Sequence, residues 1–159
     1  MIRSTASHYL ALKNDENGIE DFKRMVENIW EMFPSSVCDM EIDKPSLIEW
    51  IINVQPTIRC VSIRNNVITS FETLNLLFKS LKVTQYFCLT ENRNSCPKIV
   101  ITEPIAYRSV SIDHCCLTLP AILNGTNSII LSSGSELLPT DINTVLKEWQ
   151  TGTKLQNLE

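Results

Sequence analysis

Residues 58–66 read Ile58-Arg59-Cys60-Val61-Ser62-Ile63-Arg64-Asn65-Asn66, and this stretch decides the fold that the sequence predicts. Apolar side chains occupy its first, fourth and sixth positions, and an asparagine occupies its ninth. On a short strand, Val61 and Ile63 point into a core, whereas Cys60 and Ser62 point to the opposite face. The stretch therefore predicts a strand with one buried face and one outward face.

The same apolar spacing recurs along the chain. Its fourth position falls on residues 40, 61, 87, 110, 129 and 158, at intervals of 21, 26, 23, 19 and 29 residues. Leucine-rich repeats have periods of about 20–29 residues and carry an asparagine or cysteine at the ninth position. Asn66, Asn92 and Cys115 occupy that position here.

Helical spacing of apolar residues separates most of these strands, around residues 47–52, 69–81, 118–124 and 142–149. The sequence thus predicts an α/β fold, a short open leucine-rich-repeat-like solenoid with parallel strands on one face and helices on the other. A generic α/β domain is the alternative, because it also alternates strands and helices. In the last helix, Trp149 closes the apolar stripe begun by Ile142, and we expect it in the core.

The chain has two predicted parts. Residues 1–34 form an N-terminal segment with an amphipathic helix, in which apolar residues recur every three or four positions from Ile19 to Phe33. Residues 35–159 form the repeat domain.

Composition excludes several classes of function. The 159 residues are 43% hydrophobic and 20% charged, with a net charge of −4 and no cluster of Lys or Arg, so we expect no nucleic-acid partner. No apolar run has the length of a membrane span, and residues 1–18 lack the apolar core of a secretory signal. These features predict a cytoplasmic or nuclear protein whose six cysteines are thiols, with no membrane partner.

Two segments resemble a known family. Thr140, Asp141, Ile142, Asn143, Leu146, Lys147, Trp149 and Gly152, followed by Leu155 and Leu158, stand where the type-2 F-box-associated domain of nematode F-box proteins has its last unit. Residues 73–81 resemble an earlier unit of the same kind, and the resemblance covers about residues 30–159. It implies the substrate-recognition part of an F-box ubiquitin-ligase subunit, with an unknown protein substrate as partner.

In that family an F-box helix bundle precedes the domain and binds the Skp adaptor. We expect no F-box here, since there is no room for one before Ile19, so a Skp-type adaptor would bind only if an F-box is supplied elsewhere. The alternative function is a truncated or regulatory paralogue that binds partners without ligase assembly.

Only one cluster, His114-Cys115-Cys116 together with Cys88 and Cys96, suggests metal or nucleophile chemistry. The chain has no C-x-x-C pair for a structural zinc, and adjacent side chains at a strand end point apart, which disfavours a Cys/His catalytic pair. We therefore predict no catalytic, cofactor-binding or metal-binding residues and no enzyme, with a cysteine-dependent enzyme as the distant alternative.

The predicted protein-binding surface consists of the outward-pointing residues of the strands. These residues are Asp39, Glu41, Cys60, Ser62, Tyr86, Cys88, Ser109, Ser111, Ser128 and Ile130.

Overall fold

The structure is a computed structural model that describes residues 18–32, 37–64, 67–90, 99–113, 116–133 and 136–151. The chain divides into two compact units, Met1–Ser36 and Val37–Glu159, close to the boundary expected between residues 34 and 35. The ninth-position residues Asn66, Asn92 and Cys115 lie outside the described residues, as does the strand expected at residues 155–158.

Unit 1 contributes one described element, helix α1 (Gly18–Met32). Its first turn carries Glu20 and Asp21, which suit the positive end of the helix dipole. Val26 is its buried residue, whereas Met25 and Met32 are exposed. The amphipathic helix predicted for the N-terminal segment is therefore present.

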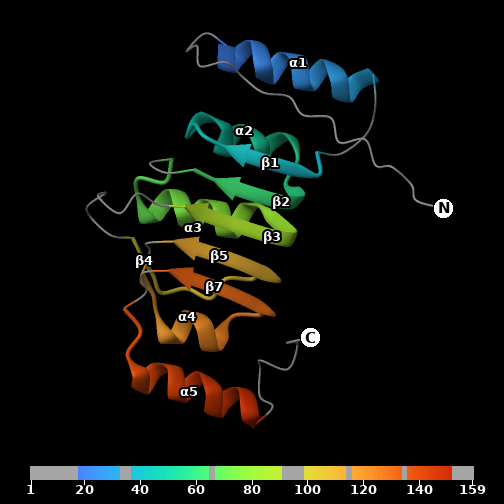
Figure 1. Ribbon diagram of the computed structural model, residues 1–159. Coiled ribbons are helices and arrows are strands. Elements are labelled where there is room, and N and C mark those ends of the chain that lie inside the picture. Colours follow the sequence, from blue (N-terminus) through green and yellow to red (C-terminus); the bar gives the residue numbers. More distant parts are fainter. Residues whose placement is uncertain are drawn as a thin grey trace, which may run out of the picture. The chain divides into compact units, whose positions relative to one another are not determined.

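Unit 2 is a mixed α/β structure built around a mostly parallel sheet (Figure 1). Its strands are β1 (Asp39–Ile42), β2 (Thr57–Ile63), β3 (Lys82–Thr90), β5 (Ser109–Asp113) and β7 (Ile129–Ser133), and they pair in that order, each parallel to the next. The helices are α2 (Ser46–Val54), α3 (Phe71–Ser80), α4 (Leu119–Asn124) and α5 (Pro139–Gln150). A second small sheet pairs β4 (Val100–Ile101) with β6 (Cys116–Leu117).

The strand register matches most of the repeat spacing found in the sequence. Met40 lies opposite Val61, Val61 opposite Phe87, and Phe87 opposite Val110, which are the expected fourth positions of the first four strands. On β7 the expectation is wrong by one residue, because Ile130 and not Ile129 lies opposite Val110.

A bulge explains why the spacing drifts. The N–H groups of Ser128 and Ile129 both donate to the carbonyl of Arg108, at 2.8 and 3.2 Å. Two residues at the start of the β7 segment therefore lie opposite the single residue Arg108, which is the arrangement of a β-bulge. Arg59 and Cys60 share the carbonyl of Cys38 in the same way. A further register shift lies between β2 and β3, where Ile58 pairs with Val83 and not with the expected Thr84.

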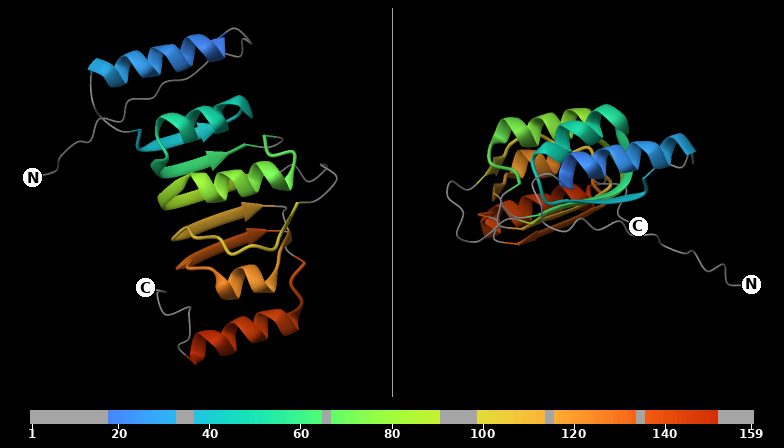
Figure 2. Two further views of the ribbon diagram at one scale, coloured as in Figure 1. Left: turned by 180° about the vertical axis from the view of Figure 1, so that it is seen from behind. Right: turned by 90° about the horizontal axis from the view of Figure 1, so that it is seen from above.

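Helices α2, α3 and α4 lie on the same face of the sheet (Figure 2), as right-handed crossovers between neighbouring parallel strands require. Their apolar side chains pack on the strands to form the core. The core includes Leu47, Ile48 and Ile51 of α2, Leu74 and Leu77 of α3, Ala121 and Ile122 of α4, and the strand residues Val61, Ile63, Phe87, Leu89, Val110 and Ile112.

Tyr107, just before β5, joins the sheet to the end of α3. Its ring packs against Phe78 and Phe87, with centroids 5.7 and 5.0 Å apart. Its buried hydroxyl group donates to two carbonyl oxygens, that of Leu77 at 3.2 Å and that of Leu81 at 2.9 Å. Burial raises the pKa of Tyr107 above its usual value, so the hydroxyl keeps its proton. Tyr107 thus satisfies the carbonyl of Leu81, the C-cap residue of α3, and supplies a second donor to that of Leu77.

Local features fix the helix ends. The Ser70 side chain accepts a hydrogen bond from the N–H of Thr73 at 3.3 Å, so Ser70 is the N-cap of α3. At α5, the N–H of Leu138 donates to the Asp141 carboxylate at 2.9 Å. After α4, a Cβ atom at Gly125 would collide with the Asn127 side-chain oxygen, so the chain needs glycine there.

The last strand and helix are far less buried than the rest of unit 2. None of the residues of β7 or α5 is buried, and Trp149 is 49% exposed. The expectation that Trp149 belongs to the core is therefore wrong. The apolar stripe exists, but the helix face that carries it is only half covered.

Candidate protein-binding face

The face of the sheet opposite the helices collects most of the predicted site residues in two rows. The first row runs from Asp39 through Cys60 and Tyr86 to Ser109, each opposite the next on neighbouring strands. The second row, in the same order of strands, contains Glu41, Ser62, Cys88 and Ser111. We call these eight residues the outward face.

Ser128 and Ile130 do not belong to this face, contrary to the sequence prediction. Ser128 is buried, with only 7% of its surface exposed, and Ile130 lies opposite the core residue Val110. The β7 residues that continue the two rows are Ile129, opposite Ser109, and Leu131, opposite Ser111. The cause is the bulge at Ser128, which shifts the register of β7 by one residue from the register predicted from the sequence. The side chains predicted to point outward therefore point inward, and the others point outward.

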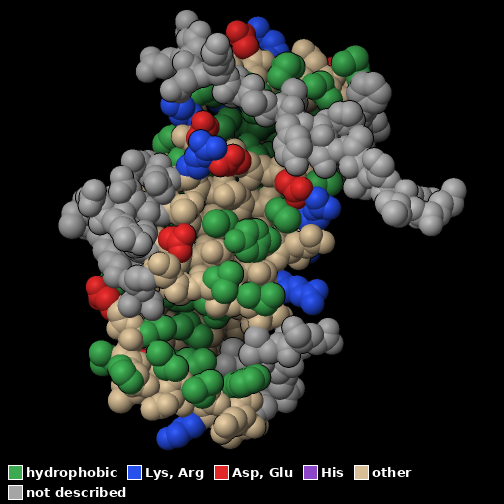
Figure 3. Space-filling view, viewed as in Figure 1, with side chains coloured by type: hydrophobic (Ala, Val, Ile, Leu, Met, Phe, Trp, Pro, Cys, Tyr) green, Lys and Arg blue, Asp and Glu red, His purple; other side chains and the backbone are tan. Residues whose placement is uncertain are grey.

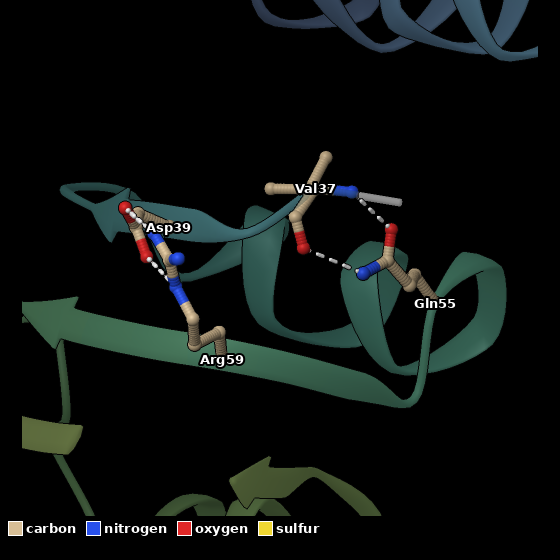
Figure 4. A network of polar contacts seen from close by, with 4 residues as sticks. All are labelled: Val37, Asp39, Gln55 and Arg59. Atoms are coloured by element: carbon tan, nitrogen blue, oxygen red, sulfur yellow. Dashed lines mark hydrogen bonds and ion pairs between the residues drawn. The ribbon is translucent and has the colours of Figure 1, made fainter. Parts of the chain in front are cut away.

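The β1 end of the outward face is charged but internally paired. The Arg59 guanidinium donates to both carboxylate oxygens of Asp39, at 3.1 and 2.7 Å (Figure 4), and Arg64 pairs with Glu41. The Arg59 guanidinium beside Asp39 holds the pKa of that carboxyl below its usual value, and Arg64 does the same for Glu41. Because both pairs are exposed, water screens them and each contributes little to stability, so they remain available to a partner.

A glutamine side chain holds the chain entering β1 beside α2 and β2. Gln55 accepts a hydrogen bond from the N–H of Val37 and donates one to its carbonyl, both at 2.8 Å (Figure 4). Its amide also lies 2.8 Å from the carbonyl oxygen of Thr57, to which it donates. The side-chain amide of Gln55 therefore makes the two hydrogen bonds with Val37 that the backbone of a neighbouring strand would make. These bonds fix the position of the segment that enters β1, the first strand of the outward face.

Tyr86 is the large side chain in the middle of the outward face, and it is 36% exposed. Its neighbours across the strands are the small residues Cys60 and Ser109. The Ser111 hydroxyl lowers the pKa of Tyr86, but partial burial and the Cys88 thiol raise it, and the net shift is upward. The phenol therefore remains neutral near pH 7, with an apolar ring and a polar tip available for contact.

Cys60, on the outward face, is not an activated thiol. Burial, and then the neighbouring Asp39, raise the pKa of Cys60, which keeps that sulfur in the weakly nucleophilic thiol form. Cys116, one of the two cysteines considered for catalysis, is buried. The other, Cys115, lies outside the described residues together with His114 and Cys96. Within the described ranges, no three His, Cys, Asp or Glu side chains come together to hold a metal ion.

Sequence reasoning missed an apolar surface at the β7 end of unit 2. Ile129 and Leu131 are 47% and 57% exposed, and four side chains of the α5 segment are exposed to a similar degree: Leu138, Ile142, Leu146 and Trp149. Hydrophobic side chains gather in the lower part of the molecule, over β7 and α5, in Figure 3. We call these six residues the terminal patch. The helical spacing of the last three was visible in the sequence, but spacing predicts only that a face is apolar and not what covers it.

Comparisons with models of protein families, with curated proteins and with solved structures found no match to this chain. None of the helices among the described residues has both the length and the apolar character needed to span a membrane.

Proposed function

We propose that unit 2 is a non-catalytic protein-binding module, a short open leucine-rich-repeat-like solenoid that binds a protein substrate on its outward face. The observation that carries this proposal is a parallel sheet with its helices on one face and two rows of mostly small side chains around Tyr86 on the other. Parallel sheets are usually covered on both faces, so an outward face of this composition favours contact with another molecule.

The strand arrangement supports the solenoid part of the proposal. The strands pair in chain order, and equivalent inward positions recur at Met40, Val61, Phe87, Val110 and Ile130. The bulge beside β1 recurs beside β5, which is expected when each strand repeats the geometry of the previous one.

The composition of the outward face supports the binding part. A tyrosine surrounded by serine and cysteine side chains allows close approach of a partner backbone, and tyrosines are frequent hot spots in protein interfaces. The paired charges of β1 and β2 supply a polar rim at one end.

The resemblance to the type-2 F-box-associated domain suggests which kind of protein-binding module this is. We propose the substrate-recognition role of that family, in the cytoplasm or nucleus, with a Skp-type adaptor engaged only through an F-box supplied elsewhere. Asp141, one of the residues that carry the resemblance, has a structural role here, since its carboxylate caps α5 by accepting a hydrogen bond from the N–H of Leu138. A second role, partner binding without ligase assembly, uses the same face.

The test is a partner capture that compares matched arginine substitutions. Ser111→Arg places a long charged side chain on the outward face, opposite Cys88, whereas Asn53→Arg places it on exposed α2, which lies on the opposite face. We expect in-cell crosslinking of the full chain to recover the same partner with the wild-type chain and Asn53→Arg, and to lose it with Ser111→Arg. Equal recovery by both variants, with circular dichroism confirming that both are folded, would show that the outward face is not the binding surface.

The captured partner then distinguishes the two roles. If the chain acts within a ligase, the Skp adaptor is captured with it, and raising the level of the chain shortens the lifetime of the partner. If the chain binds without a ligase, the adaptor is absent and the lifetime of the partner increases.

A further inference from the structure

The terminal patch lies at the upper end of the sizes of apolar patches that monomers expose. Its six large side chains are each about half exposed, and at about 200 Å² for a large side chain they present on the order of 600 Å² of apolar surface. Two such patches in contact would bury on the order of 1,200 Å², which reaches the lower end of the range for stable protein interfaces. The patch is thus large enough for one interface with a second copy of itself.

We propose that the terminal patch is a dimer interface, in which α5 of one copy packs antiparallel against α5 of a second copy. This goes beyond the binding role proposed above, because it uses none of the eight residues of the outward face. A patch that binds its own copy about a two-fold axis forms a closed pair, so it buries the apolar surface without leading to filaments.

The spacing on α5 fits this antiparallel arrangement. Ile142, Leu146 and Trp149 lie on one face of the helix at successive turns, and all three are 46–50% exposed. With the two-fold axis beside Leu146, Trp149 of each copy packs against Ile142 of the other, so a large side chain meets a medium one at both ends. The two Leu146 side chains then meet near the axis.

The charges of α5 do not oppose this register. Lys147 of one copy faces Thr144 of the other, and Asp141 faces Gln150. No two side chains of like charge are brought opposite one another within α5, and the two helix dipoles run in opposite directions. Like charges facing each other across an interface would have argued against self-association.

The experiment is sedimentation of the full chain across a concentration series around the micromolar range, the affinity expected for an interface of this size. We expect the sedimentation coefficient to rise from that of a monomer to that of a dimer and no further. Leu146→Glu should remain monomeric throughout the series, because it would place two carboxylates at the two-fold axis. Leu76→Glu is the matched control, since Leu76 lies on α3 and is 42% exposed, and it should dimerise like the wild-type chain.

A second variant keeps the proposal testable if Leu146→Glu fails to fold. Leu146→Cys should form a covalent dimer with a short bis-maleimide linker, far faster than the wild-type chain or Leu76→Cys. A monomer at every concentration, a dimer that Leu146→Glu leaves intact, or assemblies that keep growing with concentration would each overturn the proposal. A monomer would leave the patch to a different protein or to residues 152–159 of the same chain.

Discussion

Replacing Tyr107 by phenylalanine tests the link between the sheet and the end of α3. The substitution removes one oxygen atom and keeps the ring, so the contacts with Phe78 and Phe87 remain. It removes the hydrogen bonds to Leu77 and Leu81. The carbonyl of Leu77 still accepts from the N–H of Leu81, at 2.9 Å, so the main loss is at the Leu81 carbonyl.

From these contacts we expect Tyr107→Phe to lower the free energy of unfolding by about 1–2 kcal/mol, the loss of one buried hydrogen bond with its acceptor left unsatisfied. Urea unfolding followed by far-ultraviolet circular dichroism measures this, and the slope of the free energy against urea should not change. Tyr86→Phe is the control, because Tyr86 lies on the outward face, and it should change stability by less than about 0.5 kcal/mol.

The pH dependence supplies a second measurement on the same variant. Burial raises the pKa of Tyr107 in the folded protein, whereas in the unfolded chain the phenol ionises near its ordinary pKa of about 10. The contribution of the group is therefore fully present below about pH 10 and is lost as the pH rises through the folded pKa. The advantage of the wild-type chain over Tyr107→Phe should shrink above about pH 10. A substitution with no effect on stability, or an advantage that does not change at alkaline pH, would refute the assigned role of the hydroxyl.

Two further substitutions test other parts of unit 2. Gly125→Ala should cost about 1–3 kcal/mol in urea unfolding, because the new Cβ collides with Asn127 and lies 3.1 Å from the carbonyl oxygen of Ala121. Thr126→Ala, at an exposed neighbouring position, should have little effect, and equal effects would contradict the packing at Gly125. Trp149→Ala, measured at concentrations below dimerisation, should cost only about 1–2 kcal/mol, whereas Leu77→Ala in the core should cost about 2–5 kcal/mol. An equal loss of unfolding free energy for Trp149→Ala and Leu77→Ala would contradict the half-exposed position of Trp149.

The sequence predicted the relative register of the first four strands correctly from Asp39, Cys60, Tyr86 and Ser109 onward, because apolar core positions there alternate with outward ones. Val61 and Val110 each have small or polar residues on both sides, so only one choice of buried face fits there. On β7 the run Ile129-Ile130-Leu131 is apolar at every position, and both choices of face fit equally well. The bulge that decides between them depends on the Arg108 carbonyl, which has no signature in the sequence.

The candidate site was predicted in part for the same reason. The eight residues of the outward face follow from strand alternation alone, and they lie in two rows as expected. The terminal patch could not be predicted, because the sequence of α5 is equally consistent with a helix packed in the core. Only the arrangement of the neighbouring elements determines how much of Trp149 and Leu146 they cover.

The order of the strands has a consequence for how unit 2 folds and unfolds. Each strand pairs only with strands that are near it along the chain, so no contact within the main sheet has to wait for distant segments to meet. Folding can therefore begin at β2 and β3, around the buried Phe87, and extend outward in both directions. None of the side chains of β7 and α5 is buried, so we expect these two elements to open more easily than β2 and β3 and their amide hydrogens to exchange with solvent sooner.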